Sequence, residues 1–422
     1  IIYIRGNAGV GKSRLVYETK NAVNNYIYLP CDEILQKSFN PFQYFLKEYF
    51  EQTEKPDKKN FDYIYDNLLH FISKKKLQKE LIRTKSFIGS ILGLHWKDSL
   101  FEQLDAKQKY ENILYGIRNF FVALSLTKPL VLHLENAHKI DEDSKQLFEV
   151  LFNNPDEYSI NFVVSCRSND DGTEFKLDSS NLKQTEITLQ NFGTSDSTKI
   201  IASLMNTKSV PGKTADLIYS KTSGNPFFTE QLVSFLTEKE ILNDKCEIVK
   251  TEFDIPANIN SVILARLDKL SPDLKEVTKT ASVLGTRFKD QILGSMMGKE
   301  EIKAQMMEGE KEDLWVSSAS SHTFQNDMIR ESAYQLILKK DIRELHEKAA
   351  NSIYNVFSEQ IEEHYADLTY NYQNAEILDK AVYYLEKAGD YAKEMYQNTA
   401  ALGFYEKLLV VVEKMENKPI KI

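Results

Sequence analysis

One octapeptide near the start of the chain constrains the fold more than any other stretch. It follows an apolar run at residues 1–4 and leads into a helix-like stretch at residues 14–19. Its spacing of Gly, four residues and Gly-Lys-Ser is that of a phosphate-binding loop, or P-loop. The residues of this predicted loop are Gly6, Asn7, Ala8, Gly9, Val10, Gly11, Lys12 and Ser13.

The residue types of the loop suit phosphate chemistry. Glycines let backbone N–H groups turn inward around a phosphate with no Cβ in the way. The helix start adds N–H donors and the positive end of the helix macrodipole. Lys12 can then reach the β- and γ-phosphates, and the Ser13 hydroxyl can ligate Mg²⁺. The octapeptide therefore predicts a nucleotide site with Mg²⁺.

Length and charge narrow the remaining possibilities. A chain of 422 residues with 42% hydrophobic residues is long enough for two to four domains with cores of their own. The formal net charge is −9 and the sequence pI is about 5.5. This balance argues against a general binder of nucleic acid or anionic membranes, so neither is predicted as a partner.

The cysteines and the ends of the chain indicate the cellular compartment and the context of the protein. Cys31, Cys166 and Cys246 are far apart and form no metal-binding spacing, which favours reduced thiols in a cytoplasmic protein. We find no signal peptide and no apolar run of transmembrane length. Because the chain begins on Ile1, directly at the first apolar run, we expect a segment of a longer protein.

Five short apolar runs predict the strands of an α/β fold. Stretches with apolar residues at helical spacing, such as residues 42–50, 61–73 and 109–126, separate several of them. This alternation predicts a five-stranded, mostly parallel sheet. Ligands of such sheets bind at the carboxyl ends of strands, so the P-loop, Glu135 and Arg167 are expected to converge. The predicted strands are residues 1–4, 26–29, 129–136, 161–167 and 186–189.

The chain is predicted to be mainly helical from about residue 194. A Ser-Gly-Asn-Pro turn at residues 223–226 precedes one helix, and residues 314–324 alternate like a small hairpin. Residues 381–389 and 400–408 share small and aromatic residues at similar offsets. That pattern is typical of tetratricopeptide-type (TPR-like) repeats, with a plain α-helical hairpin as the alternative.

Taken together, these landmarks resemble the STAND-type P-loop ATPase segment of large signalling proteins. Its neighbours there include class III adenylyl cyclase domains, LuxR-type regulators and serine/threonine or histidine kinases. The resemblance spans nearly the whole chain and implies a preference for adenine nucleotides. It extends the P-loop past Arg14, and it makes Gly224-Asn225-Pro226 a Gly-x-Pro motif, which places Gly224 and Pro226 near the nucleotide.

The resemblance also implies a division into four domains. The first three are a P-loop NTPase domain at residues 1–195, a helical lid at 196–257 and a winged-helix-like domain at 258–345. TPR-like helices follow from residue 346 to residue 422. The winged-helix-like region holds 13 basic and 14 acidic residues, so it lacks the positive charge that DNA binding requires. We expect it to be a packing module.

The Walker B stretch departs from the family pattern. Glu135, His138 and Asp141 resemble it, but Asn136 replaces the usual second acid and Lys139 the usual tryptophan. Further along the chain, Asn326 stands where the family often has histidine.

Two catalytic assignments stay open at this point. Either Glu135 is the Mg²⁺-side carboxylate and Asn136 stands at the position of the general base, or Glu135 is the base and the metal acid is missing. An amide has no useful basicity, so with Asn136 in the base position hydrolysis should be slow.

Arg167 is either a sensor of the γ-phosphate or a salt-bridged surface residue. His133, inside an apolar strand, is expected to be a core histidine.

The sequence thus predicts an ATP-binding regulatory module with weak ATPase activity at most. Bound ATP or ADP would act as a conformational switch. The C-terminal helices would bind a protein partner or another part of the same polypeptide. Two rival functions remain, an efficient ATPase and an interaction scaffold with a vestigial nucleotide site.

Overall fold

The chain forms two compact units in the computed structural model. The sheet unit comprises Ile1–Tyr3, Thr19–Glu186 and Ile342–Ile422, and the P-loop unit comprises Ile4–Glu18 and Ile187–Asp341. The structure describes residues 1–20, 23, 25–32, 37–53, 56–153, 158–167, 174–179, 182–250, 253, 255–256, 258–298, 302–318 and 321–416.

A five-stranded sheet confirms the predicted α/β fold. Its order is β2-β3-β4-β1-β5, and β2–β3 and β3–β4 pair in parallel. The register sets Leu29 opposite Leu134 and Leu132 opposite Phe162. Each of the five predicted strands is present. Their bounds are β1 (Ile2–Arg5), β2 (Tyr26–Pro30), β3 (Leu130–Glu135), β4 (Ile160–Cys166) and β5 (Thr185–Thr188).

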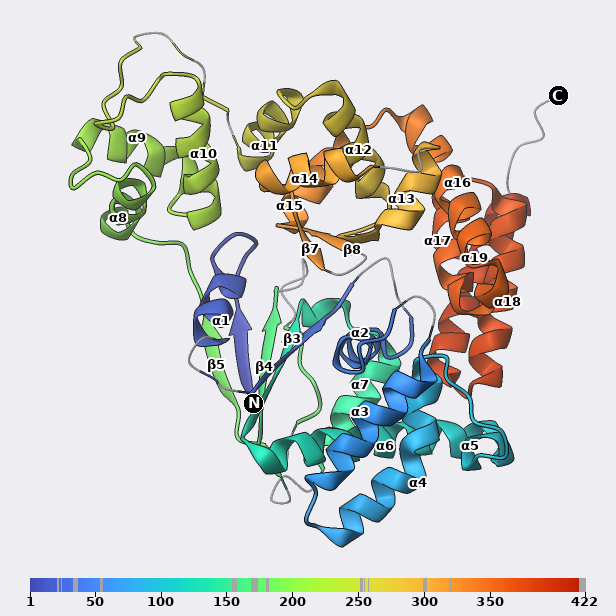
Figure 1. The fold of residues 1–422 in the computed structure, drawn as a ribbon. Coiled ribbons are helices and arrows are strands. Elements are labelled where there is room, and N and C mark those ends of the chain that lie inside the picture. The colour runs from blue at the N-terminus through green and yellow to red at the C-terminus, as the bar shows by residue number, and fades with distance from the viewer. Residues whose placement is uncertain are drawn as a thin grey trace, which may run out of the picture. The chain divides into compact units, whose positions relative to one another are not determined.

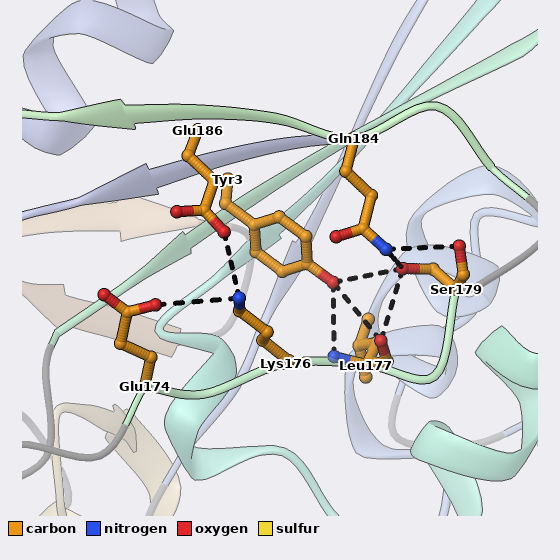
Figure 2. Close-up of polar contacts among 7 residues, drawn as sticks. All are labelled: Tyr3, Glu174, Lys176, Leu177, Ser179, Gln184 and Glu186. Carbon is orange, nitrogen blue, oxygen red and sulfur yellow. Dashed lines mark hydrogen bonds and ion pairs between the residues drawn. The ribbon is translucent and has the colours of Figure 1, made fainter.

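The segment before β5 holds the first strand by side-chain contacts (Figure 2). The Tyr3 hydroxyl accepts a hydrogen bond from Leu177 N at 3.2 Å and lies 3.4 Å from Ser179 Oγ. Gln184 Nε2 donates to the same Ser179 Oγ at 3.1 Å. At the strand itself, Thr185 N donates to Ile1 O. Residues more than 170 positions apart are thereby joined in one sheet.

Helices and aromatic side chains build the core of the sheet unit. Phe42, Phe50, Phe61 and Phe121 are fully buried, and the Phe42–Phe121 and Phe50–Phe61 ring pairs pack in edge-on and tilted geometries. Such pairs add about 0.5–1.5 kcal/mol each beyond their buried area. The stretch Lys74-Lys75-Lys76 is exposed, as its charge predicts. The helices are α2 (Asn40–Tyr49), α3 (Lys58–His70), α4 (Lys75–Ile91), α5 (Leu100–Gln103), α6 (Ala106–Thr127) and α7 (Glu142–Phe152).

The C-terminal part of the sheet unit is helical, as predicted. In α18, the small or apolar residues Ala381, Leu385 and Ala388 recur on one face and are buried. A Cβ on Gly389 would lie 2.5 Å from the Tyr405 ring, so the small-and-aromatic pattern creates close helix packing. These elements, red and orange in Figure 1, are α16 (Lys339–Val356), the 3₁₀ segment η3 (Ser358–His364), α17 (Tyr365–Asn374), α18 (Leu378–Glu394) and α19 (Asn398–Glu416).

The P-loop unit combines the loop with helices and a small antiparallel sheet. The sheet has the order β6-β8-β7, and its β7–β8 pair lies within the hairpin predicted at residues 314–324. A winged-helix assignment and the four domain boundaries stay predictions. The strands are β6 (Arg287–Lys289), β7 (Trp315–Ser318) and β8 (Ser321–Phe324). The helices are α1 (Lys12–Lys20), α8 (Thr194–Leu204), α9 (Gly212–Thr222), α10 (Pro226–Glu238), α11 (Ile259–Asp268), α12 (Pro272–Val283), α13 (Asp290–Met297), α14 (Lys303–Lys311) and α15 (Asp327–Gln335).

No helix among the described residues combines the length and the apolar character needed to cross a membrane.

Candidate nucleotide site

The glycines of the octapeptide give its backbone the shape of a phosphate cradle. Gly6, Gly9 and Gly11 have φ values of +149°, +77° and +98°, a region that L side chains rarely adopt. A Cβ on Gly6 would lie 2.7 Å from the carbonyl oxygen of Leu189, whereas one on Gly11 would meet no atom within 4 Å. Open space beside Gly11, at the start of α1, fits a bound phosphate.

Lys12 closes this loop on itself. Its ammonium donates to Gly6 O at 2.7 Å and to Asn7 O at 2.9 Å, and the residue is only 8% exposed. The positive charge is therefore held inside the curve of the loop, where the anionic groups of a nucleotide would be attracted to it. Contact of Lys12 with the β- and γ-phosphates stays a prediction.

Ser13 and Arg14 follow on the exposed side of the first turn of α1. Ser13 is exposed at the helix start, where a hydroxyl can reach a metal ion. Arg14 instead pairs with Glu18 one turn along, at 2.6 Å, and both side chains are more than half exposed. The Arg14 side chain thus lies along the helix in this structure.

The Gly-Asn-Pro turn contacts the loop through two hydrogen bonds. Asn225 Nδ2 donates to Ala8 O at 2.9 Å, and Phe227 N donates to Gly9 O at 3.2 Å. Pro226 is the first residue of α10, and Asn225 caps this helix by accepting from Phe228 N at 3.0 Å. The turn at residues 224–226 therefore lies beside the P-loop within the P-loop unit, and its approach to a nucleotide stays a prediction.

In the sheet unit, Glu135 ends β3 inside a polar cluster. Its Oε2 lies 2.5 Å from Ser165 Oγ and 2.9 Å from His133 Nε2. The other ring nitrogen of His133 is 2.5 Å from the Tyr26 hydroxyl. Burial beside Glu135 raises the pKa of Tyr26, so its hydroxyl stays protonated. His133, which is 2% exposed, is a core histidine as predicted, and it fixes the orientation of the acid.

The next two predicted residues occupy distinct positions. Asn136 has φ 54° and ψ 43°, a left-handed conformation that Asn and Asp adopt more easily than other non-glycine residues. Arg167 directly follows β4 and is half-buried. The order of the sheet sets β4 between β1 and β3.

A family model matches the N-terminal part of the chain. Residues 1–164 match the family model of the AAA ATPase domain. This part of the chain is therefore similar to AAA ATPase domains. The match includes the P-loop, Glu135 and Asn136, and it confirms the P-loop ATPase resemblance for this part. Arg167, Gly224 and Pro226 lie beyond the matched residues.

Two solved structures are similar to the chain overall. One is a signal transduction ATPase with numerous domains (STAND) that carries a tetratricopeptide repeat sensor, from Pyrococcus horikoshii, at 13% identity and a TM-score of 0.49. It is matched over 99% of this chain, which spans 56% of that protein's length. The other is a Walker-type ATPase of Pyrococcus abyssi, at 13% identity and a TM-score of 0.33, over 79% of this chain and 90% of that one. No curated protein matches the chain.

Asp141, which lies within the matched residues, caps two helix starts. It accepts from Ser144 N at 2.8 Å and Ser144 Oγ at 2.7 Å, at the start of α7. It also accepts from Phe39 N at 3.0 Å and Asn40 N at 3.3 Å, at the start of α2. Burial raises the pKa of Asp141 to about 6, although the hydrogen bonds from Ser144 oppose this rise. This acid of the Walker B-like stretch thus acts as a structural cap.

We expect Asp141→Ala to destabilise the protein by about 2–3 kcal/mol, because it leaves several buried N–H groups without an acceptor. The measurement is chemical unfolding followed by circular dichroism. Asp105→Ala is the matched control, since Asp105 caps α6 through one exposed hydrogen bond from Gln108 N, and it should cost about 1 kcal/mol or less. Equal losses for the two variants would contradict the double-cap role.

Sequence reasoning missed the partners that hold the predicted site residues. Asn before Pro is a usual helix start, so the cap by Asn225 was accessible from the sequence. Its second hydrogen bond, to Ala8, was not, because 217 positions separate the two residues. The Ser165 contact to Glu135 likewise depends on how β3 and β4 pair, and only the folded sheet supplies this information.

Proposed function

We propose that this chain is the ATP-binding regulatory module of a larger, cytoplasmic STAND-type signalling protein. Bound ATP or ADP acts as a conformational switch, and hydrolysis is slow. The AAA ATPase match of residues 1–164 and the glycine geometry of the P-loop support nucleotide binding. The three cysteines are free and buried, which agrees with a reducing compartment.

The observation that carries the switch proposal is the composition of the P-loop unit. Residues 4–18 belong to the same compact unit as α8 to α15, and the turn before α10 hydrogen-bonds the loop at Ala8 and Gly9. A nucleotide that changes the loop therefore acts directly on the helices that follow. Coupling of this kind shifts a population between two arrangements when the nucleotide prefers one of them.

A few side chains carry the proposed roles of the site. Lys12 meets the β- and γ-phosphates, Ser13 ligates Mg²⁺ directly, and Glu135 holds Mg²⁺ through water, because Mg²⁺ keeps much of its hydration. Arg167 senses the γ-phosphate, and Asn136 positions a water without accepting its proton. The backbone of the P-loop, Arg14, Gly224 and Pro226 complete the site.

The C-terminal helices are proposed to bind a protein partner or another segment of the same polypeptide. Large apolar side chains are exposed there, with Tyr383 on α18 and Leu402 and Leu409 on α19 each more than half accessible. Neighbouring exposed apolar residues favour an interaction surface. Nucleic acid and membrane are not proposed as partners, in line with the net charge of −9.

Calorimetry with Mg-ATP and Mg-ADP, alongside steady-state phosphate release, tests this function. We expect saturable binding of both nucleotides at a 1:1 ratio, with turnover well below the median of enzymes, about 10 s⁻¹. Turnover at or above that value would establish an efficient ATPase instead. Failure to bind either nucleotide would leave only an interaction scaffold.

A further inference from the structure

We propose that the first turn of α10 is a working part of the phosphate cradle, with Asn225 as its positioning residue. The inference rests on the proposed nucleotide binding and names the group that prepares the loop for it. It makes the amide side chain of Asn225 responsible for the orientation of two P-loop peptide groups.

Two consecutive carbonyl groups of the loop are held from outside. Ala8 O accepts from Asn225 Nδ2 at 2.9 Å, and Gly9 O accepts from Phe227 N at 3.2 Å. Both donors belong to the start of α10, more than 200 positions along the chain. The two carbonyl groups at the centre of the loop are thus held by residues at the start of α10.

These two bonds set the direction of the N–H groups that follow. In a trans peptide group, the C=O and the next N–H point in opposite directions, and no cis bond occurs among the described residues. Fixing Ala8 O toward α10 therefore turns Gly9 N–H away from it. Fixing Gly9 O turns Val10 N–H away in the same sense. These N–H groups are the kind of donor with which a glycine-rich loop holds phosphate.

The amide of Asn225 is fixed in orientation by its two partners. Its Oδ1 accepts from Phe228 N at 3.0 Å while its Nδ2 faces Ala8 O. A backbone N–H can only donate and a carbonyl can only accept, so the reverse orientation would lose both bonds. One side chain therefore caps α10 and holds the P-loop simultaneously.

Close contacts leave no room for a side chain at Gly9, beside Asn225, or at Gly224, beside Phe192. A Cβ on Gly9 would lie 2.8 Å from Asn225 Oδ1, and one on Gly224 would lie 1.9 Å from Phe192 O. Gly224 also has φ +75° and its carbonyl accepts from Phe192 N at 2.9 Å. The turn before α10 is thus also held by Phe192, which keeps Asn225 against the loop.

The two roles of Asn225 can be separated by substitution. Serine and aspartate both cap helices well, so Asn225→Ser and Asn225→Asp retain an acceptor for Phe228 N and lose the amide donor to Ala8 O. The serine variant adds no charge, which separates loss of the donor from repulsion of phosphate. Asn258→Ser is the matched control, because Asn258 caps α11 by accepting from Ser261 N at 2.9 Å.

The experiment combines calorimetry with Mg-ADP and hydrogen exchange of the ligand-free protein. We expect Asn225→Ser to weaken Mg-ADP binding about fivefold to tenfold, the effect of one lost hydrogen bond. Asn225→Asp should be weaker still because of its charge. Exchange in residues 4–16 should accelerate without ligand in Asn225→Ser, whereas Asn258→Ser should match the parent protein in both measurements.

Each contrary result has a distinct meaning. If the parent protein binds Mg-ADP and Asn225→Ser binds equally well with unchanged exchange in residues 4–16, the positioning role is wrong and the proposed function stands. If Asn258→Ser loses as much affinity as Asn225→Ser, helix capping alone explains the effect and the inference fails. If the parent protein binds no nucleotide, the proposed function and this inference are both overturned.

Discussion

Lys12→Ala is expected to weaken binding of Mg-ATP and Mg-ADP at least tenfold. The Lys12 ammonium lies within the P-loop, 2.7 Å from Gly6 O and 2.9 Å from Asn7 O, and we propose that it meets the β- and γ-phosphates from there. Tenfold corresponds to about 1.4 kcal/mol, a modest value for a charge-assisted contact with phosphate. Isothermal titration calorimetry measures the change directly.

Lys20→Ala is the control for this prediction. Lys20 is an exposed lysine in the last turn of the same helix, α1, so its removal changes the net charge equally without touching the P-loop. The affinity of Lys20→Ala for Mg-ATP and Mg-ADP should match that of the parent protein. Unchanged affinity in Lys12→Ala, with thermal unfolding midpoints that show both variants folded, would refute a phosphate site at this loop.

Asn136→Asp is expected to raise ATP hydrolysis about tenfold or more. A positioned general base raises a reaction rate roughly 10²–10⁴-fold. Because the site around residue 136 holds an amide and is not tuned for a carboxylate, we expect a rate increase at the low end of this range or below it. The backbone should tolerate the change, because Asp as well as Asn adopts the left-handed conformation found there, with φ 54°. Nucleotide affinity should change little, since the side chain would act on water.

Glu135→Gln distinguishes the two assignments of the Walker B positions. If Glu135 holds the Mg²⁺ side, this change weakens Mg²⁺-dependent binding; if Glu135 is the base, it abolishes turnover and leaves binding intact. Glu142→Gln, which removes an exposed carboxylate in the first turn of α7, controls for charge. Should Asn136→Asp be no faster than the parent protein while Glu135→Gln binds ATP without turnover, the general-base position belongs to Glu135.

The contacts of Glu135 explain why neither assignment follows from the sequence. Ser165 and His133 both contact its Oε2, so the acid is held rigidly whichever role it has. An apolar strand ending in Glu-Asn predicts a carboxylate at the carboxyl end of a strand, and Glu135 ends β3 in the structure. The sequence carries no sign that a serine of the neighbouring strand would hold it, because strand order is a property of the whole sheet.

Local patterns account for the elements that were predicted correctly. Apolar runs bounded by polar residues predicted all five strands, and alternation at residues 314–324 predicted the β7–β8 pair. Non-local contacts account for what was missed. The chain's distant segments form the two compact units, and neither periodicity nor composition encodes which segments meet. The association of α10 with Ala8 and Gly9 is the clearest case.

The residues that hold the P-loop lie far along the chain, so the loop can be fixed only after they have been synthesised. Gly6 lies close to Leu189 O, and the carbonyls of Ala8 and Gly9 are held by Asn225 and Phe227. A fragment that ends at residue 164, where the AAA ATPase match ends, contains the whole octapeptide and none of these supports. During synthesis the loop likewise waits for more than 200 further residues before its backbone is fixed. Nucleotide capture by a nascent or truncated chain should therefore lag behind formation of the central strands β3 and β4.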